Sequence, residues 1–184
     1  MLWLCPHFFT LPSRIPVSNI LITFFLNTLL FPAFAIFLMR KLELIQDIEM
    51  YEHKDRFIPL IAVMVFYIWC AVVSIKSKFP YAVQLLILGA VCVLVLSFIV
   101  TLYFKSSLHA AGISSALAFW ILIFAYTQTD VLWLVMVWII LAGIIGTARL
   151  ILKAHTIHEL ITGFSIGILG VLMGKLILSY IYAI

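Results

Sequence analysis

Charge is the scarcest property of this sequence. Charged residues make up 10% of the 184 residues, whereas a soluble domain carries roughly a quarter. Hydrophobic residues account for 66% of the chain, and the mean hydropathy is +1.29. Too little charge remains to cover a water-facing surface, which excludes a soluble globular protein. We therefore expect a surface that faces lipid and one compact domain over residues 1–184, with a short N-terminal extension at about residues 1–16.

Cysteine is scarce as well. Only Cys5, Cys70 and Cys92 are present, and the last two lie inside apolar runs, where cysteine fills space as a small hydrophobic residue. This excludes a disulfide framework and a cysteine-based metal site. The net charge of +4 is not clustered, so we expect no nucleic-acid partner. The first 19 residues lack a basic segment followed by a small-residue cleavage site, and we expect no removable signal peptide.

Long apolar runs dominate what is present. A helix that crosses a bilayer needs about 20 apolar residues. The runs are continuous rather than alternating, which favours helices over a barrel and leaves no backbone group unpaired in lipid. Pro32 predicts a kink in the first run. The sequence therefore predicts an all-α polytopic membrane protein with six spans, at about 17–39, 57–75, 81–104, 108–126, 131–148 and from 160 to the end of the chain.

Reactive side chains gather in three of the five connections between these spans. The connections at 76–80 and 127–130 are short and chemically plain, whereas those at 40–56, 105–109 and 149–159 hold most of the histidines, acids and bases. Connections one, three and five of a six-span protein lie on the same side of the membrane. Topology alone therefore predicts a polar site on one face. The apolar spacing within 40–56 fits either a surface amphipathic helix or a solvated extension of the first span.

The last span carries glycines at spacings of four, three and four residues, which place them on one helix face. Small residues let helices approach closely in lipid, so we interpret this face as a packing surface. No internal repeat supports an inverted-repeat transporter. The glycine face consists of Gly163, Gly167, Gly170 and Gly174, and we expect its matching surface to include Gly143 and Gly146.

The connection before the last span has the residues that phosphoryl transfer requires. Arg149 lies six residues before His155, and Glu159 lies four residues after it. Arginine has a planar group suited to phosphate oxygens. Histidine can attack phosphorus when a neighbour fixes its tautomer, and a carboxylate one helical turn away can hold the other ring nitrogen. His53 and His158, taken singly, are expected to be structural.

A second polar stretch precedes the fourth span. Ser106 or Ser107 is suited to cap the start of that helix, and the free N–H groups of a capped helix start bind anions. His109 would lie at this helix start, where it could protonate a leaving oxygen.

These residues resemble two signatures of the type 2 phosphatidic acid phosphatase superfamily. Arg149-x5-His155-x3-Glu159 is similar to S-R-x5-H-x3-D, and Ser106-Ser107-Leu108-His109 is similar to P-S-G-H. The order of the signatures, the two spans between them and the six-span layout also match. Ala148 replaces the usual serine, and Glu159 replaces the usual aspartate. The first signature, K-x6-R-P, is absent as such, and its nearest counterpart is the segment 54–59.

The resemblance implies an enzyme that removes phosphate from a lipid phosphate or pyrophosphate without a metal ion or other cofactor. His155 would be the nucleophile that forms a phosphohistidine, Glu159 would orient it, and His109 would be the general acid. Arg149 and Ser107 would bind phosphate. The remaining positive charge would come from the following bases: Lys54 and Arg56, or Lys105 and Lys153.

Three alternatives stay open. The first is a catalytically silent protein of the same fold that binds a lipid or a partner. The second is a small channel or transporter with the histidine, arginine and glutamate residues as a proton or ion relay. The third, ranked below phosphoryl transfer, is a single zinc ion held by His109, His155 and Glu159. Prenyl transferases of the aromatic type and alcohol phosphatidyltransferases need several spaced aspartates, whereas the second to sixth spans offer only Asp130.

The membrane orientation is predicted differently by charge and by the resemblance. The positive-inside rule would place the more basic face, which carries the site, in the cytoplasm. Some of these bases would be present to bind phosphate and not to set the orientation, so the count of bases is a poor guide here. The resemblance implies a site that faces outwards. We therefore expect a bacterial inner-membrane protein with a periplasmic site. The site face has seven bases (Arg40, Lys41, Lys54, Arg56, Lys105, Arg149 and Lys153) and the opposite face has four (Arg14, Lys76, Lys78 and Lys175).

Overall fold

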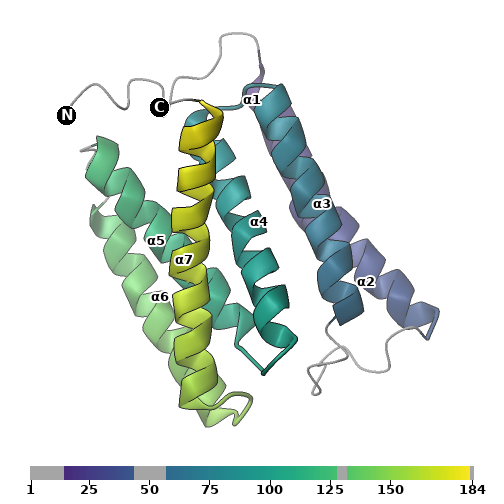
Figure 1. The fold of residues 1–184 in the computed structure, drawn as a ribbon, viewed down its shortest axis with the longest axis vertical. Coiled ribbons are helices and arrows are strands. Elements are labelled where there is room, and N and C mark those ends of the chain that lie inside the picture. Colours follow the sequence, from purple (N-terminus) through teal and green to yellow (C-terminus); the bar gives the residue numbers. More distant parts are fainter. Residues whose placement is uncertain (1–14, 44–56, 128–131, 183–184) are drawn as a thin grey trace.

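The protein is an all-α membrane bundle, as predicted. The computed structural model describes residues 15–43, 57–127 and 132–182 (Figure 1). Within them, six helical segments are long and apolar enough to cross a bilayer, the first being a continuous run of α1, η2 and α2. The elements are α1 (Val17–Phe25), the π-helical turn η2 (Leu26–Leu30), α2 (Phe31–Lys41), α3 (Phe57–Lys76), α4 (Tyr81–Thr101), α5 (Leu108–Thr127), α6 (Leu132–Ile151) and α7 (Ile157–Ile181).

The helix ends differ slightly from the predicted ones. α4 ends at Thr101 although the apolar run continues to Phe104, because hydropathy marks the depth of a residue in the membrane and not the end of its helix. α6 continues to Ile151, beyond the predicted end at 148. α7 begins at Ile157 instead of 160, since polar side chains complete its first turn.

The predicted disturbance at Pro32 takes the form of a π-helical turn. Proline has no N–H, so it leaves a carbonyl of the preceding turn without its helical partner. The chain widens into η2 directly before Phe31 and Pro32. In this turn the Tyr67 hydroxyl of α3 donates a long hydrogen bond of 3.5 Å to the Thr28 carbonyl oxygen. A polar contact from α3 therefore helps to satisfy the irregular part of the first span.

The helix α7 packs closely against two neighbours. It packs against both α4 and α5, and these are the most extensive helix pairs among the described residues. α3 covers the other side of α4, α6 packs against α5, and the first span packs against α3 (Figure 1). The elements that carry the two predicted signatures are therefore direct neighbours.

The glycine face of α7 is a packing surface, as predicted. A Cβ atom at Gly170 would lie 2.8 Å from the Val93 backbone nitrogen of α4, and one at Gly163 would lie 2.5 Å from the Ser107 carbonyl oxygen. The matching surface, however, is formed by α4 and α5. The expectation for Gly143 was wrong, because a Cβ there would meet no atom within 4 Å, whereas Gly146 contacts the ring of Phe164.

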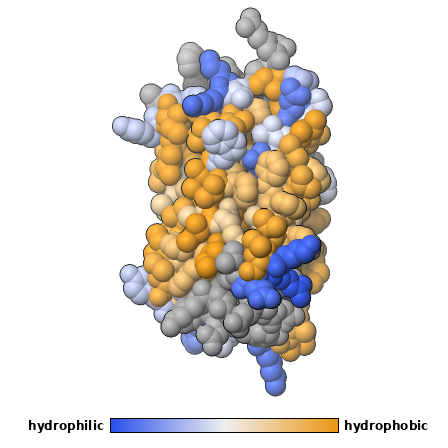
Figure 2. Space-filling view, turned by 90° about the vertical axis from the view of Figure 1, so that its right-hand side faces the viewer, coloured by the Kyte–Doolittle hydropathy of each residue, from blue (hydrophilic) through white to orange (hydrophobic). Residues whose placement is uncertain are grey.

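The helix ends that flank the three polar connections share one face of the bundle. α2, α4 and α6 end at the lower end of the view in Figure 1, where α3, α5 and α7 begin. On the side shown in Figure 2, hydrophobic residues cover the middle of the molecule and hydrophilic residues gather towards its two ends. This pattern matches a bilayer core between two polar interfaces, and it places the predicted site at one interface.

The contact of α7 with α5 can be tested by adding one methyl group. A Cβ at Gly167 would overlap the Ala111 carbonyl oxygen and the Ser114 hydroxyl. We expect Gly167→Ala to lower the free energy of unfolding by about 1–3 kcal/mol, as overpacking does. Gly143→Ala is the matched control, which should be neutral or slightly stabilising because alanine favours helices. Thermal unfolding in detergent measures both, and equal effects would contradict the packing assignment.

Candidate functional site

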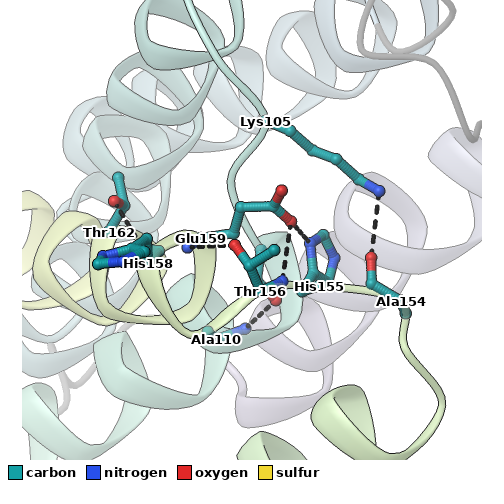
Figure 3. A network of polar contacts seen from close by, with 9 residues as sticks. Lys105, Ala110, Ala154, His155, Thr156, His158, Glu159 and Thr162 are labelled. Carbon is teal, nitrogen blue, oxygen red and sulfur yellow. Dashed lines mark hydrogen bonds and ion pairs between the residues drawn. The ribbon is translucent and has the colours of Figure 1, made fainter.

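The two connections that carry the predicted signatures meet at one end of α7. The Lys105 ammonium group donates a hydrogen bond of 3.1 Å to the Ala154 carbonyl oxygen (Figure 3). The Ser107 backbone N–H donates to the Glu159 carbonyl oxygen at 3.2 Å. Gly163 permits this approach because it has no side chain to strike Ser107. The starts of α5 and α7 therefore lie side by side.

The end of α6 brings the backbone of Arg149 next to that of Ala154, the residue before His155. Lys153 N–H donates to the Leu150 carbonyl oxygen at 3.0 Å, and Ala154 N–H donates to the Arg149 carbonyl oxygen at 3.1 Å. This pair of bonds is a Schellman motif, which needs a left-handed residue, usually glycine. Here Lys153 occupies that position with φ 50°. The motif turns the chain out of α6, and His155 follows two residues after Lys153.

The start of α7 is a capping box. Thr156 has an extended backbone, and its hydroxyl accepts a hydrogen bond of 3.4 Å from the Glu159 N–H. The Glu159 carboxylate accepts one of 3.4 Å from the Thr156 N–H in return. A threonine followed three residues later by a glutamate is a known sequence signal for a helix start. That signal could have identified Thr156 and the correct start of α7, which hydropathy missed.

The predicted contact between Glu159 and His155 is present. The His155 Nδ1 atom lies 2.7 Å from Glu159 Oε2, the same oxygen that accepts from the Thr156 N–H (Figure 3). The His155 side chain is 6% exposed and that of Glu159 is 22% exposed. An ionised carboxylate only accepts hydrogen bonds, so a neutral His155 carries its hydrogen on Nδ1 and a lone pair on Nε2. In that tautomer Nε2 is the ring atom suited to act as a nucleophile.

The start of α5 is capped by Ser107 and not by Ser106. The Ser107 hydroxyl accepts a hydrogen bond of 3.3 Å from the Ala110 N–H, and its side chain is fully buried. This geometry gives Ser107 a structural role, and nothing in it supports the predicted contact of the hydroxyl with phosphate. His109 is the second residue of α5 and is exposed on the same face of the membrane.

Three bases lie in the two connections that carry the predicted signatures, one of which holds the paired His155 and Glu159. Lys105 is bonded to Ala154 but has further N–H donors for an anion. Arg149 lies half-buried in the last turn of α6, and its guanidinium has no hydrogen bond or ion pair within the described residues. Lys153 is exposed. Cations are also favourable at a helix C-terminus, so part of this charge stabilises α6. Other predicted residues lie outside the described ones, namely Lys54, Arg56, His53 and the segment 44–56.

Two other expectations concern His158 and a metal ion. The ring of His158 points away from His155 in Figure 3, which agrees with the structural role expected for it. In the parts of the chain that the structure describes, no three His, Cys, Asp or Glu side chains are grouped closely enough to hold a metal ion. The zinc alternative at His109, His155 and Glu159 therefore has no support from geometry.

The assignment of a function rests on this chemistry. Comparisons of the chain with protein-family models, with curated proteins and with solved structures give no match. The described site combines a histidine held by a carboxylate, Lys105 bonded to the residue before that histidine, and two adjacent helix starts, with Arg149 and Lys153 in the same connection. Such a combination is suited to attack on a phosphorus atom and to binding of the phosphate oxygens.

The role of Ser107 as a helix cap predicts an effect on stability. We expect Ser107→Ala to lower the free energy of unfolding by about 1 kcal/mol, the usual effect of losing an N-cap hydroxyl. Ser115→Ala is the matched control, because the Ser115 hydroxyl bonds the Gly112 carbonyl oxygen inside the same helix and caps nothing. Thermal unfolding in detergent compares them. A Ser107→Ala variant as stable as the control would show that the cap contributes nothing.

Proposed function

We propose that this protein is a membrane lipid phosphate phosphatase, similar to the type 2 phosphatidic acid phosphatases, that works through a phosphohistidine. The observation that carries the proposal is the 2.7 Å contact between His155 Nδ1 and Glu159 Oε2. A histidine held in this way has a fixed tautomer and a nucleophilic Nε2 atom. The neighbouring Lys105, Arg149 and Lys153 supply the positive charge that a phosphate requires.

The reaction has two balanced steps. In the first, His155 Nε2 forms a bond to phosphorus while the bond from phosphorus to the leaving oxygen breaks, and His109 gives that oxygen a proton. In the second, the oxygen of a water molecule forms a bond to phosphorus and gives a proton to His109, while the bond from phosphorus to Nε2 breaks and inorganic phosphate leaves. Glu159 stabilises the charge that develops on His155 in both steps, while the bases and the helix-start N–H groups stabilise the phosphate oxygens. The route needs no metal ion, as the resemblance implies.

A lipid substrate fits the surroundings of the site. Large apolar side chains are exposed beside the bases in both connections, which is typical of a membrane interface. A phosphate at this level can reach His155 while its hydrocarbon chain stays in the bilayer. The exposed apolar residues around the site are Leu102, Tyr103, Phe104, Ile151, Leu152 and Ile157.

Phosphate release tests the proposed activity. Detergent-purified protein is given phosphatidic acid, phosphatidylglycerol phosphate or a polyprenyl pyrophosphate in the presence of a chelator. We expect release from at least one of them, and a loss on the order of a thousandfold or more in His155→Ala. His158→Ala is the matched control on the same helix start and should retain activity. No release from any substrate by the folded protein would overturn the proposal in favour of a silent binding protein or a transporter.

We also propose that the site faces the periplasm of a bacterial inner membrane. Lys153 and Lys78 form a matched pair, because both are exposed, left-handed residues two positions after the end of a helix, at opposite ends of the bundle. In a Cys5→Ser background, Lys153→Cys should react with a membrane-impermeant thiol reagent in intact cells. Lys78→Cys should react only after the cells are permeabilised. The reverse pattern would place the site in the cytoplasm, as the charge count suggests.

A further inference from the structure

Thr156 has a position next to the candidate nucleophile that none of the proposed chemistry uses. Its N–H and its hydroxyl both bond to Glu159, each at 3.4 Å, and its backbone continues directly from His155. The oxygen that accepts from the Thr156 N–H is the one that lies 2.7 Å from His155 Nδ1. One carboxylate oxygen therefore links the helix cap to the histidine.

This shared oxygen matters because a glutamate side chain is otherwise mobile. Holding it in one rotamer costs conformational entropy, more than for most residues. Glu159 is partly exposed, so packing alone does not hold it. The capping box fixes the backbone of Glu159 through the threonine hydroxyl and fixes its carboxylate through the Thr156 N–H. The position of the oxygen that His155 meets is thus set by the cap.

The rest of the connection leaves His155 with little freedom of its own. The Schellman motif holds Lys153 and Ala154, and Lys105 holds the Ala154 carbonyl oxygen. The capping box holds Thr156. His155 is the residue between these two motifs, and its ring direction depends on where the Glu159 carboxylate stands.

We propose that Thr156 is a positioning residue for His155. Its capping box with Glu159 fixes the carboxylate oxygen that binds His155 Nδ1, and it thereby selects the tautomer in which Nε2 is the reacting nitrogen. The assignment of a reaction to Nε2 rests on the function proposed above. The link from Thr156 through Glu159 to the His155 tautomer does not, and it can be measured without a substrate.

Three variants separate positioning from simple helix capping. Thr156→Gly removes the hydroxyl, yet glycine at an N-cap costs little stability, so the variant is expected to fold. Thr156→Ser keeps a hydroxyl and should restore the parent behaviour. Thr162→Ala is the matched control, because the Thr162 hydroxyl bonds the His158 carbonyl oxygen on the same helix and touches neither Glu159 nor His155. Each variant is first shown to unfold cooperatively in detergent.

The first readout is the tautomer of His155, measured by nitrogen NMR on the whole protein with isotope-labelled histidine and assigned with a His155→Asn variant. We expect the Nδ1–H form to dominate in the parent, in Thr156→Ser and in Thr162→Ala. In Thr156→Gly its ratio to the Nε2–H form should fall about twofold, because glycine weakens an N-cap only slightly. The proposal would be overturned if Thr156→Gly had the same tautomer ratio as the parent protein, or if the ratio fell equally in Thr162→Ala.

The second readout is kinetic and uses whichever lipid phosphate the parent hydrolyses. Thr156→Gly should lower kcat about twofold with KM unchanged, since the substrate still meets the same bases. A rise in KM at constant kcat would contradict the positioning role. If the parent hydrolyses none of the lipids, the proposed function fails, but the tautomer ratios still decide whether Thr156 controls His155.

Discussion

The contact of α7 with its two neighbours, through a face without side chains, is the constraint on which the rest of the structure depends. At Gly163 a Cβ atom would lie 2.5 Å from the Ser107 carbonyl oxygen, so only glycine lets the starts of α5 and α7 come together. Apolar side chains gain little from leaving lipid for one another, and close backbone contact is the main source of helix association there. The same contact allows the Ser107 N–H to reach the Glu159 carbonyl oxygen. A packing feature deep in the bundle therefore places two polar connections beside each other at the membrane interface.

The local structure of the connection between α6 and α7 then places His155 against Glu159. The Schellman motif at the end of α6 and the capping box at the start of α7 occupy four of the five residues of the connection, 152–156. His155 lies between them and meets the Glu159 carboxylate at 2.7 Å. Glutamate at position 159 suits this arrangement because glutamate is preferred at the third helical position of a capping box. The capping box therefore gives a structural reason for glutamate at this position.

Much of this could be predicted from the sequence because the bilayer and local spacing impose it. Six apolar runs predict six spans, and a spacing of four residues predicts that Glu159 can reach His155. Other features have no local signal. Nothing in the sequence pairs Lys105 with Ala154, and a lysine at a left-handed position, as at Lys153, lacks the glycine that usually marks a Schellman motif. Gly143 and Gly146 are both small, which favours them as part of the surface that matches the glycine face, whereas in the structure that face packs on α4 and α5.

The central claim is that His155 becomes covalently phosphorylated. To test this, the protein is mixed with a radiolabelled lipid phosphate and the reaction is stopped rapidly without acid. Mass spectrometry of its peptides then locates the phosphate. We expect an acid-labile, base-stable phosphate on the peptide that contains His155. It should form and disappear within the turnover time, and it should be absent from His155→Ala. Turnover of the lipid with no phosphorylated protein, or with the phosphate on another residue, would contradict it.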